Sequence, residues 1–531
     1  MTASNALTAL PARPDSWSAL LERDDVVLER GILHLHDPLA TPDAARTADL
    51  LLIAAALEDA GIPVLLIRHA VRVPALAVDA ARRADALSVL ADLGGLEPLY
   101  AKLKGAAPVP IAEAADALRA SSLRVFRPRV VRAGGLAFGA DTAVRIEFWR
   151  SEDGVVHAPR ENVLMRRSTP AEDIGIVDVE RYGRSWRTVA GMFDPHPDEF
   201  THDIDMVFSW VDGSSTDFQR QRAARLAEYV VGDGDDGAAR YRQTDELRYA
   251  LRSVHMYAPW VRRIFIATDS PAPAWLLDDP KVTIVRSEEF FADPSVLPTH
   301  NSHAVEAQIH RIEGLAEHFL YSNDDMFFGR PVAPEMFFTS GGLSKFVECG
   351  VRIGAGPTRL ERSGHDNALR VNRALLEARF GRVITRDLEH CATPLRRSVM
   401  AELEGEYADD FARTAASRFR SATDISATNC LYHYHALFTG RAIATTEPRV
   451  RYVQTTMAIA LPRMERLASG RSTDMFCLND GGAAEVPEAL RVRAVSAALE
   501  RMFPVPGPWE RADVSAEPAE ALSAARSVAP R

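Results

Sequence analysis

Residues 300–331, HNSHAVEAQIHRIEGLAEHFLYSNDDMFFGRP, carry the strongest signal for a fold class. The first part predicts a helix with one apolar and one polar face, at 100° per residue. The apolar face holds Val305, Ile309 and Ile312, and the polar face holds His303, Glu306 and His310. Residues 318–322 then predict a buried strand, which Asn323-Asp324-Asp325 follows. Carboxylates where a strand ends are typical of α/β enzymes that hold a metal–phosphate group.

Strands and helices alternate on the N-terminal side of this stretch. Strands are expected at residues 204–211, 263–268 and 282–285, and helices at 218–231 and 245–257, with a GDGDDG loop at 232–237. Such alternation predicts a mostly parallel sheet with helices on both faces. The fold class expected for this part of the chain is therefore α/β.

The remaining sequence indicates further domains, because 531 residues exceed one ordinary core. Residues 1–195 read as a separate N-terminal α+β accessory domain. Its helices are expected at 44–60 and 75–93, and its strands at 64–67, 123–131 and 142–149. The polar, proline-containing segment 194–202 reads as a linker to a second domain; the family resemblance described below implies that this domain is catalytic and spans 203–510. Residues 511–531, rich in Pro, Ala and Ser, predict a partly ordered tail.

Bulk composition narrows the function. A net charge of −11 argues against a nucleic-acid partner, which requires a basic surface. Four cysteines without a CxxC pair indicate reduced thiols and a cytoplasmic location. We expect neither a signal peptide nor a membrane span, since the longest apolar run is far short of the roughly 20 residues needed. Peripheral association with the inner face of a membrane and homo-oligomerisation are both compatible with this composition.

Acidic residues provide the candidate metal ligands. Asp324 and Asp325 suit Mg²⁺ or Mn²⁺, which takes one or two carboxylates beside waters and substrate phosphates. Asp212 follows another predicted strand and precedes a glycine that lets the backbone turn close to a ligand. Each of these aspartates also fits an ordinary turn or helix cap. Asp480, in CLNDG, taken alone reads as a turn residue.

Two pairs of arginines are candidate diphosphate ligands. Arg248 and Arg252 are four residues apart on a predicted helix that begins with Asp245 and Glu246. Two guanidinium groups on one helix face can bind a diphosphate bidentately, or can form salt bridges with nearby acids. Arg418 and Arg420 stand in a predicted loop, SRFRSATDIS, where they fit either a phosphate clamp or surface charge.

Histidine is the usual base for deprotonating an acceptor hydroxyl near neutral pH. His390 precedes Arg396-Arg397, and His365, His433 and His435 are further candidates. Most single histidines are not catalytic, so residue chemistry alone does not select among them.

The combination of segments, in this order, resembles the Stealth family of sugar-1-phosphate transferases. The matching stretches are IDMVFSWVDGS at 204–214, two segments within 244–331, EHCATPLRRSVMAELEGEYADDFARTAASRFRSATDIS at 389–426, and FCLND with FPVPGPWE at 476–480 and 503–510. The bacterial exopolysaccharide, or capsular polysaccharide, phosphotransferases of the family are the most similar members. The chain departs from the common pattern at His300 and His303, and at Gln243-Thr244.

The resemblance implies a Rossmann-like (GT-A-like) sheet and transfer of hexose-1-phosphate from a UDP-sugar to a glycan hydroxyl. UMP would leave, and Mg²⁺ (or Mn²⁺) and arginines would stabilise the phosphoryl charge. It implies catalytic roles for His390 as base and for Asp245, Glu246 and Arg420, with Asp324 and Asp325 on the metal. The substrate-binding residues it implies are Asp212, Arg248, Arg252, Asn301, His303, Glu306, His310, Asn323, Arg418 and Asp480.

Two other functions remain open from sequence. A metal-dependent nucleotide-sugar glycosyltransferase would use similar residues but attack the anomeric carbon and release UDP. A non-catalytic polysaccharide-binding subunit would need none of the acids or histidines for its function.

Overall fold

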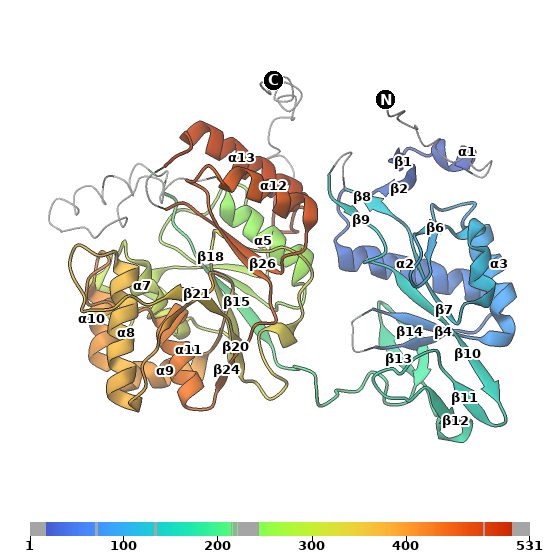
Figure 1. Cartoon of the computed structure of the whole chain (residues 1–531), viewed down its shortest axis with the longest axis horizontal. Coiled ribbons are helices and arrows are strands. Elements are labelled where there is room, and N and C mark those ends of the chain that lie inside the picture. Colours follow the sequence, from blue (N-terminus) through green and yellow to red (C-terminus); the bar gives the residue numbers. More distant parts are fainter. Residues whose placement is uncertain are drawn as a thin grey trace, which may run out of the picture.

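The structure is a computed structural model that describes residues 17–69, 73–131, 135–213, 215, 220, 244–481 and 484–511. Its elements fall into two groups on either side of the segment 190–203 (Figure 1). No sheet pairs a strand of one group with a strand of the other among these residues. The predicted helix at 218–231 and the predicted loop at 232–237 lie outside the described residues, apart from residue 220.

The first group combines helices with antiparallel and mixed sheets. Its helices are α1 (Trp17–Leu21), α2 (Pro42–Asp59) and α3 (Arg83–Leu93). Its strands are β1 (Val26–Glu29), β2 (Ile32–His36), β3 (Leu65–Ile67), β4 (Ala75–Asp79), β5 (Tyr100–Lys102), β6 (Val109–Pro110), β7 (Ser122–Phe126), β8 (Arg129–Val130), β9 (Ala137–Phe138), β10 (Val144–Glu152), β11 (Val155–His157), β12 (Ser168–Pro170), β13 (Ile176–Arg181) and β14 (Arg184–Val189). The α2 helix begins at Thr41, whose hydroxyl accepts a hydrogen bond from the amide of Ala44.

The predicted helix at 75–93 is wrong in its first part. Residues 75–79 form β4, which pairs in parallel with β10 and antiparallel with β3. All of Ala75, Leu76, Ala77 and Val78 are buried, which is typical of an interior strand covered on both faces. A short apolar run of this kind has no period that distinguishes strand from helix. Helix α3 starts only at Arg83.

The second group is built on a five-stranded sheet. Its order is β17 (Val282–Val285), β16 (Ile264–Ala267), β15 (Ile204–Ser209), β18 (His318–Asn323) and β23 (Thr393–Arg396). The first four strands are parallel, and β23 runs antiparallel to β18. The predicted α/β class, with a mostly parallel sheet, is therefore confirmed.

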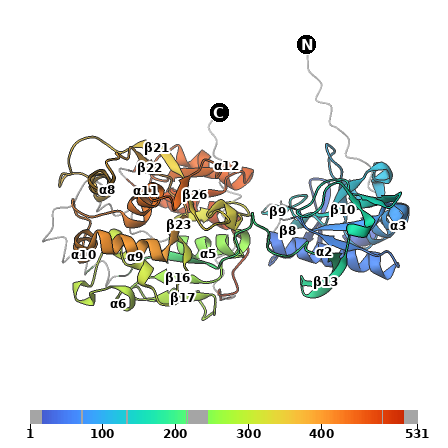
Figure 2. The ribbon, with the colours of Figure 1, turned by 90° about the horizontal axis from the view of Figure 1, so that it is seen from below.

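Helices cover both faces of this sheet, as predicted. Alternate residues of β15 point to opposite sides: Met206 and Phe208 join one buried cluster, and Val207 joins the other. The first cluster includes α5 (Glu246–Tyr257), α12 (Ala460–Gly470) and α13 (Glu488–Met502), and the second includes α7 (Ser302–Glu306), α8 (Gly364–Phe380), α9 (Arg397–Glu406), α10 (Ala408–Ala416) and α11 (Tyr432–Phe438). Figure 2 labels α5 and α9, which belong to these two different clusters.

Short elements complete this group. They are α6 (Ser287–Phe290), β19 (Met326–Phe328), β20 (Ser344–Phe346), β21 (Glu348–Arg352), β22 (Arg386–Leu388), a π-helix at Ala427–Leu431, β24 (Ala442–Ala444), β25 (Val450–Gln454) and β26 (Met475–Asn479). The first cluster also contains Ala45 of α2 and Phe138 of β9, so the two groups share buried apolar surface. No helix among the described residues is long and apolar enough to cross a membrane.

The predicted helix after residue 300 is shorter than its periodicity suggested. Helix α7 ends at Glu306, and residues 309–311 form a separate 3₁₀ turn. The chain bends at Gln308, whose side chain accepts a hydrogen bond from the amide of Ala292. His303 and His310 therefore do not share a helical face, and this part of the sequence prediction is wrong.

Candidate active site

The candidate site lies at the carboxyl edge of the parallel strands. Asp212 follows β15, and Asn323-Asp324-Asp325 spans the end of β18. Strand β23 begins at this same edge, because Tyr321 near the end of β18 pairs with Thr393 at the start of β23. His390, three residues before β23, is thus brought to the edge that carries the acids. Ligand sites of open α/β sheets lie at this edge.

Three carboxylates gather there. Burial and the charges of Asp325 and Glu246 raise the pKa of Asp324 well above its usual value. Glu246 is buried at the start of α5 and accepts hydrogen bonds from the amide of Thr244 at 2.7 Å and from its hydroxyl. The thiol of Cys477 donates to Asp325 Oδ2 at 3.4 Å, and its pKa is raised well above normal by burial and by Asp325.

This acid cluster fits a divalent cation. The raised pKa of Asp324 reflects first its burial and then the repulsion between neighbouring carboxylates. A cation bound between Asp324 and Asp325 would relieve it, and oxygen ligands of this kind suit Mg²⁺. Asn323, directly before them, accepts a hydrogen bond from the Tyr321 hydroxyl at 3.0 Å.

A second part of the site joins α7 to the loop at 417–424. The amide of Asn301 donates to Asp424 Oδ2 at 2.8 Å and to the carbonyls of Ser417 and Phe419. Asn301 also caps α7 by accepting from the amide of His303. Arg420 donates to the hydroxyl of Ser302 at 2.8 Å. These bonds fix the loop against α7.

His303 is buried beside this loop. Its Nδ1 lies 3.8 Å from Asp424 Oδ2. Burial, reinforced by the Arg420 charge, lowers the pKa of His303, so the imidazole is neutral at neutral pH. Arg418 is exposed in the same loop, two residues from Arg420. The loop thus presents Arg418 to solvent and holds Arg420 against Ser302.

His390 lies between aromatic rings rather than in a hydrogen-bonded dyad. Its ring centroid is 5.1 Å from Tyr452 and 6.0 Å from His365. Burial, the nearby His365 and Arg420 lower the pKa of His390 to about 4. The imidazole is consequently unprotonated at neutral pH, which is the form that can accept a proton.

Arg248 and Arg252 both contact the C-terminal segment. Arg252 is buried and donates to Glu510 at 2.7 Å and to the carbonyl of Phe503 at 3.0 Å. Arg248 Nε lies 2.6 Å from Glu510 Oε2. The sequence allowed either diphosphate binding or salt bridges for these two arginines, and the structure shows salt bridges. Their acid, Glu510, comes from the far end of the chain and not from the same helix. A diphosphate would have to compete with Glu510 for either arginine.

Two other predicted residues serve the packing around the site. Glu306 is buried and accepts hydrogen bonds from the hydroxyls of Tyr321 at 3.2 Å and Thr428 at 3.0 Å. His310 lies against α9, where its Nε2 is 2.9 Å from Glu404 Oε2. Both connect α7 and the 3₁₀ turn to neighbouring elements.

Asp212, Asp245 and Asp480 lie at loop positions. The amide of Asp212 donates to the Ser270 hydroxyl at 2.8 Å. Asp245 is exposed and precedes α5 with φ of 57°, a left-handed conformation that is uncommon outside glycine. Asp480 follows β26, accepts from the Thr455 hydroxyl, and has Arg491 Nε at 3.6 Å.

Sequence reasoning missed several partners of these residues. Cys477 reaches Asp325 because β19 and β26 pair with Met326 opposite Cys477. Glu510 reaches the arginines of α5 through a bridge between Leu276 and Glu510. Asp387 is hydrogen-bonded to His365 Nε2 at 2.9 Å, close to His390. The only sequence signal for a role of Cys477 was its position in the CLND motif. The sequence separation of Arg248 and Glu510 gives no indication that the two residues are in contact.

Comparison with known families assigns the chain. Four Stealth protein conserved regions match: region 1 at residues 202–230, region 2 at 240–346, region 3 at 389–437 and region 4 at 465–520. The acids after β18 fall in region 2, and His390 and Arg420 fall in region 3. The matches follow the chain in the family's own order.

Curated relatives extend the similarity over nearly the whole chain. Exopolysaccharide phosphotransferase CpsY of Mycobacterium tuberculosis (strain ATCC 25618 / H37Rv) is 50% identical over 497 residues, covering 92% of this chain and 93% of that protein. An exopolysaccharide phosphotransferase of Nocardia farcinica is 57% identical over 387 residues, covering 72% of this chain and 76% of that protein. The α/β fold and these relatives define an enzyme of the transferase class. More particularly, the chain belongs to the Stealth family.

Solved structures are more distant. A galactosyltransferase LgtC in complex with donor and acceptor sugar analogs aligns with a TM-score of 0.28 and 9% identity, covering 55% of this chain and 95% of that chain. An overlap of this quality carries no inference about the site.

Proposed function

We propose that this enzyme transfers hexose-1-phosphate from a UDP-sugar to a hydroxyl of an acceptor glycan, releasing UMP, in exopolysaccharide or capsule synthesis. The observation that carries the proposal is the cluster of Asp324, Asp325 and Glu246 at the same sheet edge as His390. A diphosphate donor needs a cation and a proton acceptor close together. The names of the curated relatives favour this reaction among those that use such a donor.

In the proposed reaction the acceptor oxygen forms a bond to the β-phosphorus of the donor. The bond from this phosphorus to the bridging oxygen breaks, and that oxygen leaves with UMP. The sugar's anomeric C–O bond stays intact. Mg²⁺ (or Mn²⁺) at Asp324 and Asp325 would supply charge neutralisation for the phosphates when bound.

His390 takes the acceptor's proton on a ring nitrogen. Its lowered pKa keeps the ring unprotonated before substrate binds. The negative charge of a bound diphosphate raises the pKa of a nearby imidazole, which improves it as a base once the donor is in place. Arg420, fixed by Ser302 between α7 and its loop, places a positive charge at the transferred phosphoryl group.

The other predicted residues divide by their contacts. Asn301, His303 and Glu306 hold α7, the loop at 417–424 and β18 in register around Arg420. Asp212, Asp245, Asn323, Arg418 and Asp480 are assigned to the donor and acceptor at the loop edges. Arg248 and Arg252 are assigned mainly to holding Glu510. His310 is assigned to the contact with α9.

The nucleotide product distinguishes this reaction from glycosyl transfer. A panel of UDP-sugars is incubated with Mg²⁺, with and without a glycan primer, and the nucleotide is separated by chromatography. We expect primer-dependent UMP and a product that contains phosphorus. Primer-dependent UDP would replace the proposal by glycosyl transfer. The residue roles are tested separately: a chain that releases neither UMP nor UDP, and whose Asp324→Asn and His390→Gln variants still support wild-type polysaccharide production in cells, would favour a polysaccharide-binding subunit.

The proposal includes a cytoplasmic location, where nucleotide sugars are made, with the acceptor presented at the inner face of the membrane. The free, buried cysteines support a reducing compartment. Fractionation of cells into cytosol, membrane and exported material tests this part.

A further inference from the structure

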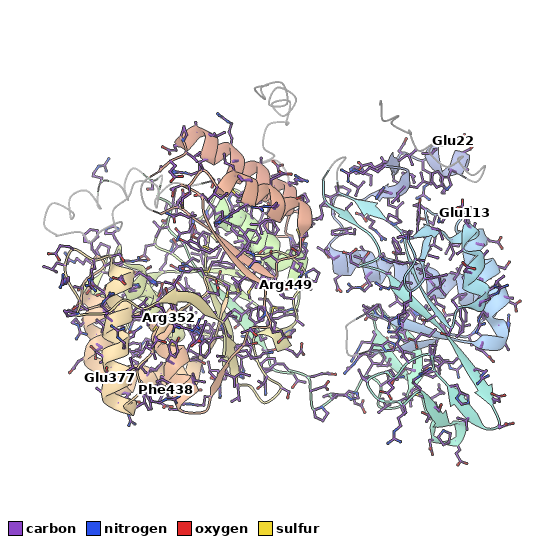
Figure 3. The ribbon with its side chains drawn as sticks, viewed as in Figure 1. Glu22, Glu113, Arg352, Glu377, Phe438 and Arg449 are labelled. Atoms are coloured by element: carbon purple, nitrogen blue, oxygen red, sulfur yellow. The ribbon has the colours of Figure 1, made fainter. Side chains whose placement is uncertain are left out.

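Three ligand-type side chains converge next to the carboxyl edge of the sheet from separate elements. His365 lies in the first turn of α8, Asp387 is on β22, and His390 lies in the loop before β23. One ligand atom from each lies within 4.8 Å of the other two. His365 Nε2 and Asp387 Oδ2 are 2.9 Å apart. In Figure 3, Arg352 marks β21, the partner strand of β22, and Glu377 marks α8.

We propose that His365, Asp387 and His390 form a binding site for a transition-metal dication, with Zn²⁺ as the representative ion. Two imidazoles and one carboxylate are the ligands that zinc and related ions take in sites with an open position. Ligand atoms about 2.1 Å from a tetrahedral ion lie about 3.4 Å from one another. The separations in this cluster need only small side-chain rotations to reach that arrangement.

The surroundings of the cluster suit a cation that enters from solvent. Asp387 is buried, whereas 34% of the His365 side chain is exposed. His390 makes no side-chain hydrogen bond among the residues that the structure describes, so a ring nitrogen is available as a ligand. The negative charge of Asp387 opposes the Arg420 charge that acts on His390, and the half-buried Glu389 directly precedes His390 in the chain.

A second cluster of similar composition illustrates why the first is favoured. Glu402, Glu406 and His435 also bring three ligand atoms within 4.8 Å. There, Arg441 binds Glu402 with both terminal nitrogens, and Arg379 binds Glu406. These arginines already occupy the carboxylates. Asp387, in contrast, has no arginine or lysine partner among the residues that the structure describes: its Oδ2 faces His365, itself a metal ligand type, and its Oδ1 accepts a hydrogen bond from the amide of Leu388.

The proposed site differs from the acid cluster in chemistry and in sequence location. Asp324 and Asp325 offer only oxygen, which favours Mg²⁺, whereas the imidazoles favour zinc. His390 lies within the region matched at 389–437, but His365 and Asp387 fall between it and the region matched at 240–346. Two of the three ligands therefore lie in a segment outside the matched family regions.

Occupation of the site has a consequence that rests on the proposed function. An ion bound to His390 uses the ring lone pair that would otherwise accept the proton of the acceptor hydroxyl. Zn²⁺ would then inhibit the transferase even with Mg²⁺ in excess. The binding of the ion itself does not depend on which reaction the enzyme performs.

The binding test titrates the full chain with Zn²⁺ by calorimetry, and with Co²⁺ by visible absorption, in buffer with millimolar Mg²⁺ to occupy oxygen sites. We expect one ion per chain. His365→Gln and Asp387→Asn should each weaken zinc binding by roughly tenfold or more, because a mutation of a residue that only hydrogen-bonds to a metal ligand already lowers metal affinity by about that factor. Glu402→Gln, in the second cluster, is the matched control and should bind as wild type. Equal affinity in wild type and both site variants would overturn the proposal.

The inhibition test measures transfer at fixed Mg²⁺ over a range of Zn²⁺, each variant being compared with its own zinc-free rate. His365→Gln should shift half-inhibition to at least about tenfold higher Zn²⁺. Binding that depends on His365 in a chain releasing no UMP would leave the site standing and overturn the proposed function. Zn²⁺ binding without any inhibition would overturn the link to His390.

Discussion

The charged form of Asp324 that would bind a cation is also the form that destabilises the folded protein. The residue sits among Asp325, Glu246 and protein atoms that remove it from water, and its pKa is raised well above the usual value. Its folded pKa exceeds its unfolded pKa, so protonation stabilises the fold at low pH. That stabilisation is lost as the pH rises through the folded pKa. A bound cation reverses the balance by favouring the ionised form.

Asp324→Asn is therefore expected to change activity and stability in opposite directions. Without Mg²⁺ the variant should melt at a higher temperature than wild type at pH 8, because one of three repelling charges is gone. Transfer should fall by about 100-fold or more. Thermal denaturation with and without Mg²⁺ checks the first part: Mg²⁺ should raise the wild-type midpoint and leave that of the variant nearly unchanged. A variant less stable than wild type in the absence of Mg²⁺ would contradict the charge argument.

Among the secondary structure elements, sequence periodicity predicted the central strands well. Strands were expected at 204–211 and 318–322 and are found at Ile204–Ser209 and His318–Asn323. Both are short apolar runs, and the polar residues that directly follow each of them favour a strand that ends there over a longer helix. The errors fall where tertiary contacts override local pattern: β4 is held by β10, and the helix after residue 300 is interrupted at Gln308. Neither partner is near in sequence.

The contact between α8 and the loop at 417–424 offers a test of how Arg420 is positioned. A Cβ on Gly364, in the first turn of α8, would lie 2.5 Å from Arg420 Cβ. Gly364→Ala should displace the arginine and lower transfer by about tenfold to 100-fold, since small displacements of catalytic groups have large effects. Gly405→Ala on α9 is the matched control, because nothing lies within 4 Å of its Cβ. Initial rates and circular dichroism of both variants give the comparison, and equal rates would argue against a role for this contact.

The link between α9 and the 3₁₀ turn at 309–311 predicts an acid-dependent stability. Burial raises the pKa of Glu404, but hydrogen bonds from His310 and Arg311 outweigh it and bring the value to about 2. Because the pKa of Glu404 is lower in the folded protein than its ordinary value of 4.5, the ionised carboxylate stabilises the fold at pH values above 4.5. This stabilisation disappears as the pH falls towards 2. Glu404→Gln should cost about 2 kcal/mol at pH 7. Urea denaturation from pH 7 to pH 3 should show the difference shrinking, whereas a constant difference would contradict it.

Across the whole molecule, the two ends of the second group of elements are joined by charge. Glu510 accepts from Arg252 and Arg248, 258 and 262 residues earlier, while Leu277 and Trp275 pair with the backbone of Trp509 and Arg511. No sequence pattern predicts that Glu510 is the partner of these arginines. Two arginines spaced four apart on a helix can bind an acidic side chain of the same protein or a phosphate of a ligand equally well. The same limit applies to His390 and Asp387, which are three residues apart in sequence but could not be linked to His365.

This junction should govern the stability of the second group of elements. Glu510 is buried, and its arginines lower its pKa against the effect of burial. Glu510→Ala leaves two largely buried guanidinium groups without this partner, so we expect a loss of about 3–5 kcal/mol in the free energy of unfolding. Glu465→Ala removes an exposed partner of Arg501, between α12 and α13, and should cost about 1 kcal/mol or less. Urea denaturation monitored by tryptophan fluorescence compares the two. A similarly small loss of stability in both variants would mean that the main role of the arginine pair is phosphate binding rather than folding. In that case Arg248→Gln should lower the transfer rate strongly and change the free energy of unfolding little.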